Sequence, residues 1–396
     1  MEQIAEPTSP KVSPAKLSDC IEHILSLTLH SSINQTLGSD LGLSNDYCSS
    51  LLQIDPHQSQ INDLDTSGGV PPYPLYKQLA SALNHCINSG VFVKASKVVM
   101  PFEEVDPREK RKDGWNMLIQ EKGCELVNML KAVKFELHVQ EPYFSQLRDG
   151  MKTTEGRCAV GEYNRIQPGA LLLFNGCLLL EVQNVECYAS FADMLEAKSL
   201  ERVLPGVRTI EEGVQIYRKF YTEEKEKLNG VVAIDVSKPD SQPIITMASI
   251  ISGLSYDGIA CLLGLMHTPG TVEEALPPPR SSLLSSFSTP HKPTATGSAL
   301  TEGARALAKH VNRASKRWWG SCSGNDSEKN KLALGVITRL IIHCVWMNIH
   351  FIQPDRCIFE IRVSEGYGAR WSQDGSKFIG FVEPHMEDGH SKKWKH

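Results

Sequence analysis

Residues 170–188 read ALLLFNGCLLLEVQNVECY, and this stretch decides the fold of the middle of the chain. Its two apolar runs are joined at Asn175-Gly176, a pair that favours a two-residue β-hairpin turn because both residues tolerate a positive φ angle. The alternating segment FELHVQ predicts a strand before the hairpin, and the apolar run GVVAIDV predicts a buried strand after it. Residues 134–237 are therefore predicted to form a sheet with short helices between its strands.

The octapeptide GMKTTEGR, residues 150–157, follows a predicted one-turn helix and opens a predicted strand. Residues two apart in a strand share a face, so Glu155 and Arg157 should point the same way, with Lys152 leaning over the same rim. A mobile lysine charge beside a planar arginine fork suits a phosphate or a base edge, and Glu155 is placed to orient either cation. The pattern favours a binding cleft, and the alternative is an ordinary ion pair at the rim of the sheet.

In this frame the octapeptide, which fits G-x-K-x-x-E-x-R, resembles the signature of the activating signal cointegrator homology (ASCH) domain, in particular that of plant-type RNA-binding members. The following hairpin, the helix YRKFYTEEKEKL and the strand GVVAIDV occur in the family's order. The resemblance implies a PUA-like β-barrel whose cleft takes RNA or a nucleotide. It also implies that four residues bind the RNA, namely Gly150, Lys152, Glu155 and Arg157.

Two other functions follow from the same resemblance. Some small bacterial members are acetylcytidine amidohydrolases with a lysine, a threonine three residues later and a helical glutamate. Lys152 and Glu212 match the first and last of these, whereas Glu155 stands where the threonine would be and removes the hydroxyl nucleophile. A nucleoside- or RNA-modifying hydrolase is therefore one alternative. The other is a protein-interaction module of a coactivator complex, docking through residues 73–133.

The fold class predicted for the whole chain is α+β. It comprises the PUA-like barrel with a helical N-terminal extension, and a separate C-terminal α+β module. Within the first 72 residues, only LSDCIEHILSLTLH has helical spacing. The predicted segments are a mostly disordered tail (1–72), a helical extension packed on the barrel (73–133), the ASCH domain (134–237), an apolar docking segment (238–267), a disordered Pro- and Ser-rich linker (268–300) and a basic α+β module (301–396).

The C-terminal module carries fifteen Lys and Arg residues against ten Asp and Glu, and five of the six tryptophans. We predict two helices followed by two strands, IFEIRVSE and FIGFVEP. A helix over 301–318 should present cations beside an aromatic pair, which suits phosphate contact and base stacking. This secondary patch is Arg305, Lys309, Arg313, Lys316, Arg317 and Trp319. The endings GYGARW and GHSKKWKH resemble those of uncharacterised bacterial proteins.

The bulk composition limits the partners. Net charge is −5, so a nucleic-acid site must be a local patch. The eleven cysteines show no C-x-x-C spacing, which indicates free thiols in a reducing compartment, and we predict neither a metal site nor a cofactor. The apolar stretch 244–266 holds Asp257 and three glycines, too interrupted for a membrane span. We expect an intracellular protein of the nucleus, the cytoplasm or both, with RNA or single-stranded nucleic acid as partner, coactivator proteins as further partners, and no membrane.

Overall fold

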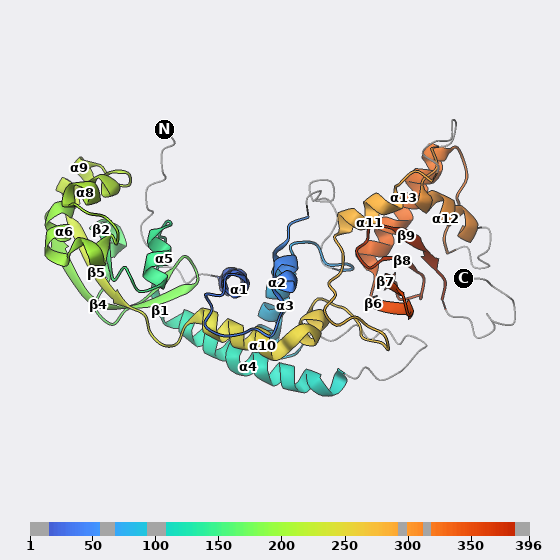
Figure 1. Ribbon diagram of the computed structural model, residues 1–396, viewed down its shortest axis with the longest axis horizontal. Coiled ribbons are helices and arrows are strands. Elements are labelled where there is room, and N and C mark those ends of the chain that lie inside the picture. Colours follow the sequence, from blue (N-terminus) through green and yellow to red (C-terminus); the bar gives the residue numbers. More distant parts are fainter. Residues whose placement is uncertain (1–15, 56–67, 93–107, 292–298, 312–317, 385–396) are drawn as a thin grey trace. The chain divides into compact units, whose positions relative to one another are not determined.

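The computed structural model of the 396-residue chain describes residues 16–55, 68–92, 108–291, 299–311 and 318–384. The chain divides into two compact units whose elements are labelled in Figure 1. Unit 1 combines residues 1–28 with 121–250, and unit 2 combines residues 29–120 with 251–396. The boundaries fall inside three helices, so each of these helices contributes residues to both units.

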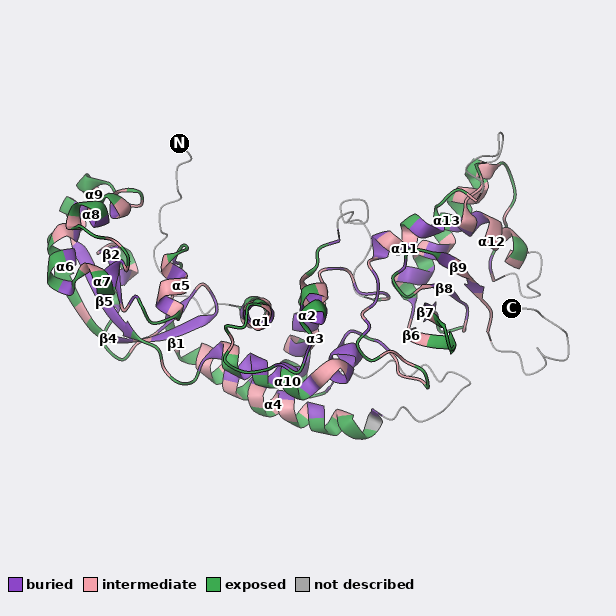
Figure 2. Ribbon diagram, in the orientation of Figure 1, coloured by how far each residue is buried: buried purple, intermediate pink, exposed green. Residues whose placement is uncertain are grey.

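Unit 1 is built on a five-stranded mixed sheet in the order β1-β3-β4-β5-β2. Its strands are β1 (Val133–Leu137), β2 (Thr154–Cys158), β3 (Leu171–Phe174), β4 (Leu178–Tyr188) and β5 (Val231–Ser237). The β1–β3 pair is parallel and the other pairs are antiparallel. Every residue of β2 is buried, including its charged ones, as the purple strand in Figure 2 shows.

The predicted hairpin is confirmed. β3 and β4 pair with Phe174 opposite Leu178, and the turn residues Asn175 and Gly176 have φ angles of 50° and 71°. Two positive φ angles give the turn a twist that matches the twist of the strands. The Asn175 side chain also exchanges two hydrogen bonds of 2.8 Å with the backbone of Val139, so the turn is tied to the chain that leaves β1.

Short helices connect the strands, and α6, α8 and α9 lie together beside the sheet (Figure 1). Their N-caps Ser190, Thr209 and Thr222 each accept a backbone N–H from the first turn, which satisfies a donor that the helix leaves unpaired. Phe191 stacks on Tyr217 with ring centroids 4.1 Å apart in the core beneath them. The helices are α5 (Tyr143–Arg148), η2 (Gly161–Arg165), α6 (Phe191–Lys198), α7 (Leu200–Val203), α8 (Ile210–Arg218) and α9 (Glu223–Asn229).

The sheet of unit 1 is not a closed barrel in its hydrogen-bond ladders. β1 and β2 are the outer strands of the order, and no ladder joins them among the described residues. The Arg157 guanidinium on β2 nevertheless donates to the carbonyl of His138, just after β1, at 2.7 Å. A side chain therefore links the two outer strands where a barrel would link them by backbone. The α+β class and the helical N-terminal region agree with the prediction.

The disordered tail predicted over 1–72 is wrong for its described residues. Helices α1 (Leu17–Ile33) and α2 (Asn45–Leu52) form there. The spacing that suggested a weak helix gives α1 one apolar stripe, and burial of this stripe supplies the stability that the isolated segment lacks. The buried residues of the stripe are Cys20, Ile21, Ile24, Leu25 and Leu29.

The helical extension predicted over 73–133 contains α3 (Leu75–Ser89) and α4 (Glu109–Ala132). Gly90 caps α3 with a φ of 73°, as its sequence indicates. Residues 29–120, which include α3, belong to unit 2, and packing of the extension on the barrel stays a prediction. The apolar helix α10 (Pro243–Leu262) is long and apolar enough to cross a membrane, but 61% of this stretch is buried, as in a core helix.

The C-terminal module of unit 2 packs helices against an antiparallel sheet in the order β6-β7-β8-β9. The sequence predicted β7 and β9 but not β6 and β8. Phe287, Phe359 and Trp371 lie in the buried core between sheet and helices. The elements are α11 (Arg280–Phe287), α12 (Glu302–Val311), α13 (Asp326–His343), β6 (Trp346–Gln353), β7 (Arg356–Arg362), β8 (Gly368–Ser372) and β9 (Phe378–Val382).

The linker predicted over 268–300 is wrong for residues 268–291. Pro279 forms the N-cap of α11, whose Leu283 and Phe287 enter the core, so the prolines begin a buried helix. Residues 266–272, which we call the strap, run along β6. The strap bonds to β6 through Met266 N–H to Met347 O (2.8 Å), Val272 N–H to Ile349 O (2.9 Å) and Phe351 N–H to Gly270 O (2.9 Å).

Candidate functional sites

The octapeptide places a buried Lys–Glu–Arg cluster in unit 1. Gly150 turns the chain out of α5 with a φ of 75°, which glycine adopts without strain. The Lys152 ammonium lies 3.1 Å from one oxygen of Glu155, and Arg157 Nε donates to the other at 2.8 Å. Lys152 also donates to the carbonyls of Thr154 and Val203. The predicted arrangement of the three charges around Glu155 is therefore present.

The predicted opening to solvent is not present. Lys152, Glu155 and Arg157 are 2%, 6% and 4% exposed. Burial lowers the pKa of Lys152 despite the neighbouring Glu155. Burial also opposes ionisation of Glu155, but the charges of Lys152 and Arg157 outweigh it and hold the Glu155 pKa below its usual value. The prediction that these side chains line an open cleft is corrected: every residue of β2 is buried, and Lys152 and Arg157 pair with Glu155 inside unit 1.

The predicted catalytic pair of Lys152 and Glu212 does not form. Glu212 lies exposed in the first turn of α8, where its carboxylate accepts the Arg208 N–H at 3.2 Å. It lines a shallow hollow with Val207, Gln215 and other residues, whereas Lys152 is buried against Val203. The geometry therefore gives an amidohydrolase of this type no support.

A second polar cluster occupies the other face of β2. Thr154 donates to Asp235, its partner in the β2–β5 register, at 2.6 Å. Lys198 binds the other oxygen of Asp235 at 2.7 Å, and Arg202 lies 3.3 Å from the first. Arg202 also donates to the Thr153 hydroxyl at 3.2 Å and is half exposed. Arg202 is thus a solvent-facing cation beside the octapeptide. The one signal of this cluster in the sequence was the polar residue Asp235 inside the run GVVAIDV.

In unit 2, a third cluster lies on the sheet face opposite the core. Strand alternation sends Ile349, Phe359 and Trp371 into the core and leaves the polar face, which we define as His350 (β6), Glu360 (β7), Arg362 (β7) and Arg370 (β8). The Glu360 carboxylate accepts Arg362 Nε and Arg370 Nε at 2.6 Å each, with His350 Nε2 at 3.4 Å. Glu360 is 2% exposed, while the other three side chains reach the surface.

The charges of this polar face determine the ionisation of Glu360. Burial opposes ionisation, but the hydrogen bond from His350 and the charges of Arg362 and Arg370 outweigh it and lower the pKa of Glu360 to about 2. Glu360 is therefore an anion at neutral pH. Sequence reasoning missed these residues because they lie on three strands, of which two were not predicted.

The lowered pKa of Glu360 predicts acid sensitivity of unit 2. The native pKa lies below the ordinary value of 4.5, so the stabilisation is complete above pH 4.5 and is lost as the pH falls toward 2. The loss should be roughly 3 kcal/mol. All six tryptophans lie in unit 2, so tryptophan fluorescence during urea unfolding reports on this unit.

Glu360→Gln should flatten this dependence on pH, and Asp355→Asn, at an exposed position between β6 and β7, should leave it as in the wild type. Equal pH dependence in the wild type and in Glu360→Gln would contradict the assignment.

The predicted secondary patch is only partly described, since Arg313, Lys316 and Arg317 lie outside the described residues. Arg305 and Lys309 reach solvent on α12. Trp319 was predicted as a stacking ring, but it is 1% exposed and donates Nε1–H to Glu383 at 2.7 Å. That prediction is corrected: Trp319 lies in the core and the partly buried Trp318 packs edge to face on it, because a large ring stabilises the module most when buried.

Comparison with known proteins locates two families in the chain. Residues 137–240 match the ASCH domain, and residues 288–383 match the CdiA C-terminal tRNase toxin domain. The crystal structure of hypothetical protein PH0355 is 44% identical to a region covering 26% of this chain and 97% of that one, with a TM-score of 0.26. The solution NMR structure of protein PF0455 from Pyrococcus furiosus is 43% identical, covering 27% and 97%, with a TM-score of 0.25. No curated protein matches.

The octapeptide and the sheet of unit 1 thus fall mostly within the residues that match the ASCH domain. The chain belongs to the family of proteins that carry an ASCH domain, and residues 137–240 are that domain. The C-terminal match covers the separate module that contains the polar face.

Proposed function

We propose that this protein binds RNA through its ASCH domain and cleaves RNA on the polar face of its C-terminal module. The observation that carries the proposal is the convergence of an imidazole, a buried carboxylate and two guanidinium groups on one side of the β6–β8 sheet. The similarity of residues 288–383 to a tRNase toxin domain supports RNA as the substrate class. The ASCH domain supports the same class independently.

The polar face contains the groups that a transesterification of RNA requires. His350 Nε2 donates to Glu360, which leaves the other ring nitrogen with a lone pair. This nitrogen removes the proton from a ribose 2′-hydroxyl, the 2′-oxygen attacks the adjacent phosphorus, and the bond from phosphorus to the 5′-oxygen breaks. The 5′-oxygen takes up a proton from solvent and the His350 imidazolium releases its proton to solvent, so the products are a 2′,3′-cyclic phosphate and a 5′-hydroxyl.

The two arginines suit the phosphate. Arg370 uses Nε for Glu360 at 2.6 Å, and among the described residues its two terminal nitrogens have no partner. Arg362 is held more firmly, because its NH1 also donates to the carbonyls of Gly366 (2.7 Å) and Glu383 (3.2 Å). A rigid Arg362 and a partly free Arg370 can therefore stabilise the negative charge that develops on the phosphate oxygens.

The test is incubation of the full chain with total tRNA, followed by analysis of the product ends. Cleavage should leave 2′,3′-cyclic phosphates and 5′-hydroxyls. An oligonucleotide with a 2′-deoxy sugar at the cut position should stay intact, since it lacks the nucleophile. Products with 5′-phosphates, or no cleavage of any RNA, would overturn the proposed reaction.

For RNA binding by the ASCH domain, the exposed side chains beside the octapeptide carry the proposal rather than the buried cluster. Met151 is 56% exposed, and the half-exposed Arg202 is hydrogen-bonded to Thr153 of the same loop. An exposed cation next to an exposed apolar side chain suits a phosphate beside an unstacked base.

Arg202→Ala should therefore weaken the binding of a short single-stranded RNA and reduce by about one the slope of log affinity against log salt. Fluorescence anisotropy at several salt concentrations measures both. Arg165→Ala is the matched control, because Arg165 is exposed in the same domain and pairs with Glu162. Equal losses of RNA affinity in the two variants would show that the octapeptide loop is not part of the binding site.

Closure of the ASCH sheet into a PUA-like barrel is part of this proposal and is supported by the family and by the Arg157 link between the outer strands. Roles in RNA processing or transcription coactivation, protein partners of a coactivator complex, and a nuclear or cytoplasmic location stay predictions. A pull-down with and without nuclease treatment separates protein partners from proteins bridged by RNA.

A further inference from the structure

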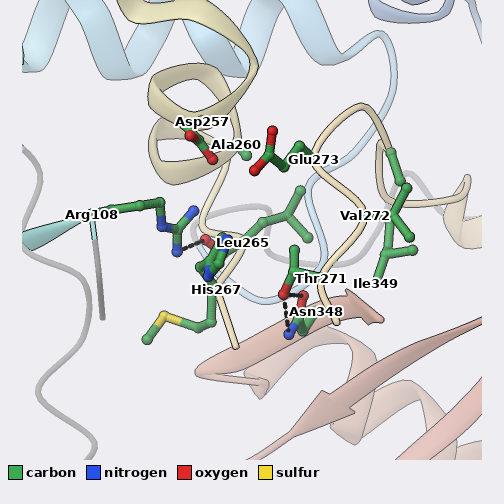
Figure 3. A pocket seen from close by; sticks show the side chains of 12 residues that line it. Arg108, Asp257, Ala260, Leu265, His267, Thr271, Val272, Glu273, Asn348 and Ile349 are labelled. Atoms are coloured by element: carbon green, nitrogen blue, oxygen red, sulfur yellow. Dashed lines mark hydrogen bonds between the residues drawn. The ribbon is translucent and has the colours of Figure 1, made fainter. Parts of the chain in front are cut away.

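Unit 2 brings together three metal-ligand side chains outside the polar face. They are Asp257 on α10, His267 in the strap and Glu273 just after the strap. Each offers one ligand atom, and these atoms all lie within 4.8 Å of one another. Figure 3 shows the carboxylates of Asp257 and Glu273 turned toward one another at the cavity that the three residues line.

We infer that this cavity binds one divalent transition-metal ion. Carboxylate oxygens and an imidazole nitrogen bind such ions at about 2.0–2.2 Å. Ligand atoms at most 4.8 Å apart can surround one ion after a small inward movement of the exposed Glu273 side chain. The cavity has room for about one water-sized atom, so an ion fits and a larger ligand does not.

His267 gives an independent reason to expect a ligand here. Its Nδ1 is buried and has no hydrogen-bond partner among the described residues. A buried polar atom that has no protein partner is expected to bind an ordered water molecule or an ion. Glu273 likewise makes no hydrogen bond or ion pair within the described part of the chain, so two of the three groups are available.

The arginines near the cavity leave one oxygen of Asp257, the third ligand, available. Arg111 binds one oxygen of Asp257, Oδ2, at 2.6 Å, which leaves Oδ1 for the ion and orients the carboxylate. Arg108 also lines the cavity, but its guanidinium donates to the carbonyl of Leu265 at 3.0 Å (Figure 3). Arg111 forms an ion pair with one of the two carboxylates, and Glu273 brings a second carboxylate to the ligand set.

One nitrogen and two oxygen ligands favour a borderline ion such as Zn²⁺ over Ca²⁺ or Mg²⁺, which prefer oxygen alone. A bound ion would join the end of α10 to the strap and its neighbour Glu273. Thr271 of the strap forms an isolated bridge with His350, so the ion would hold the strap beside the polar face. The metal is thus assigned a positioning role, independent of whether the polar face cleaves RNA.

The test uses the full chain freed of metal with a chelator and titrated with Zn²⁺. Equivalents are counted by mass spectrometry after gel filtration, and affinity is measured by calorimetry. Because other histidines and cysteines can bind zinc, the decisive quantity is the difference between variants. His267→Gln and Glu273→Gln should each bind one equivalent less than the wild type, or bind it at least about tenfold more weakly.

The matched control is Glu274→Gln, which removes an exposed carboxylate next to Glu273 and should keep every equivalent. Zn²⁺ should raise the midpoint of thermal unfolding in the wild type and in the control more than in the two ligand variants. Unchanged zinc binding in both ligand variants, or the same loss in Glu274→Gln, would overturn the site. Because Glu273 is exposed, its glutamine variant should fold normally.

Discussion

Replacing His350 with alanine is expected to lower the rate of RNA cleavage by about a hundredfold to ten-thousandfold. The imidazole transfers a proton in the proposed reaction, and no other described histidine contacts Glu360. Arg370→Ala should give a loss in the same direction, since it removes a charge that faces the phosphate. Single-turnover cleavage of tRNA with excess protein measures the chemical step for each variant.

His343→Ala is the matched control for this experiment. His343 lies exposed at the end of α13 in the same module and should be replaceable without a change in rate. Tryptophan fluorescence would confirm that the variants fold. A His350→Ala protein that folds and cleaves at the wild-type rate would exclude the polar face as the reaction centre, whatever RNA the ASCH domain binds.

Replacing Glu155 with glutamine should destabilise unit 1 by about 3–5 kcal/mol. The carboxylate is the shared partner of Lys152 and Arg157, and all three side chains are buried. Its neutralisation leaves two cations without a counter-charge inside the fold, where water cannot replace it. The loss of stability is large because these side chains are buried and do not line an open cleft as predicted.

The measurement must report on unit 1, which contains no tryptophan. Hydrogen exchange of the backbone amides of β2 and β5 serves this purpose, since both strands are buried. Glu162→Gln is the control, because Glu162 pairs with the exposed Arg165 and should contribute about 1 kcal/mol or less. Equal protection of β2 in the Glu155→Gln and Glu162→Gln variants would show that the buried cluster does not hold the domain together.

Local sequence signals determined much of the ASCH domain. The Asn175-Gly176 turn, the strand alternation and the order of the elements depend on contacts between residues close in the chain, so they can be read without the fold. The same holds for α3, where Gly90 ends the helix by its own φ preference. Short strands such as β8, with a glycine at its start, gave too little pattern to be recognised.

The burial of side chains could not be predicted from local sequence signals. The spacing in GMKTTEGR places Glu155 and Arg157 on one face, but whether that face meets water depends on η2, α7 and the outer strand β1. For the segment 268–291, a composition rich in proline and serine suggested disorder, and for α1 the spacing suggested only a weak helix in a disordered tail, while apolar partners elsewhere in the chain bury both segments. In each case the deciding contacts come from residues far away in sequence.

The sequence by itself determined the family, the hairpin and the identity of the charged residues, because each of these depends on neighbours within a few positions. The tertiary structure alone decided that Lys152 and Arg157 are buried, that His350, Glu360 and Arg370 converge from three strands, and that Asp257, His267 and Glu273 share a cavity. The physical reason is that solvent exposure and the field around a charge depend on every group packed nearby, and these groups are brought together only when the chain folds.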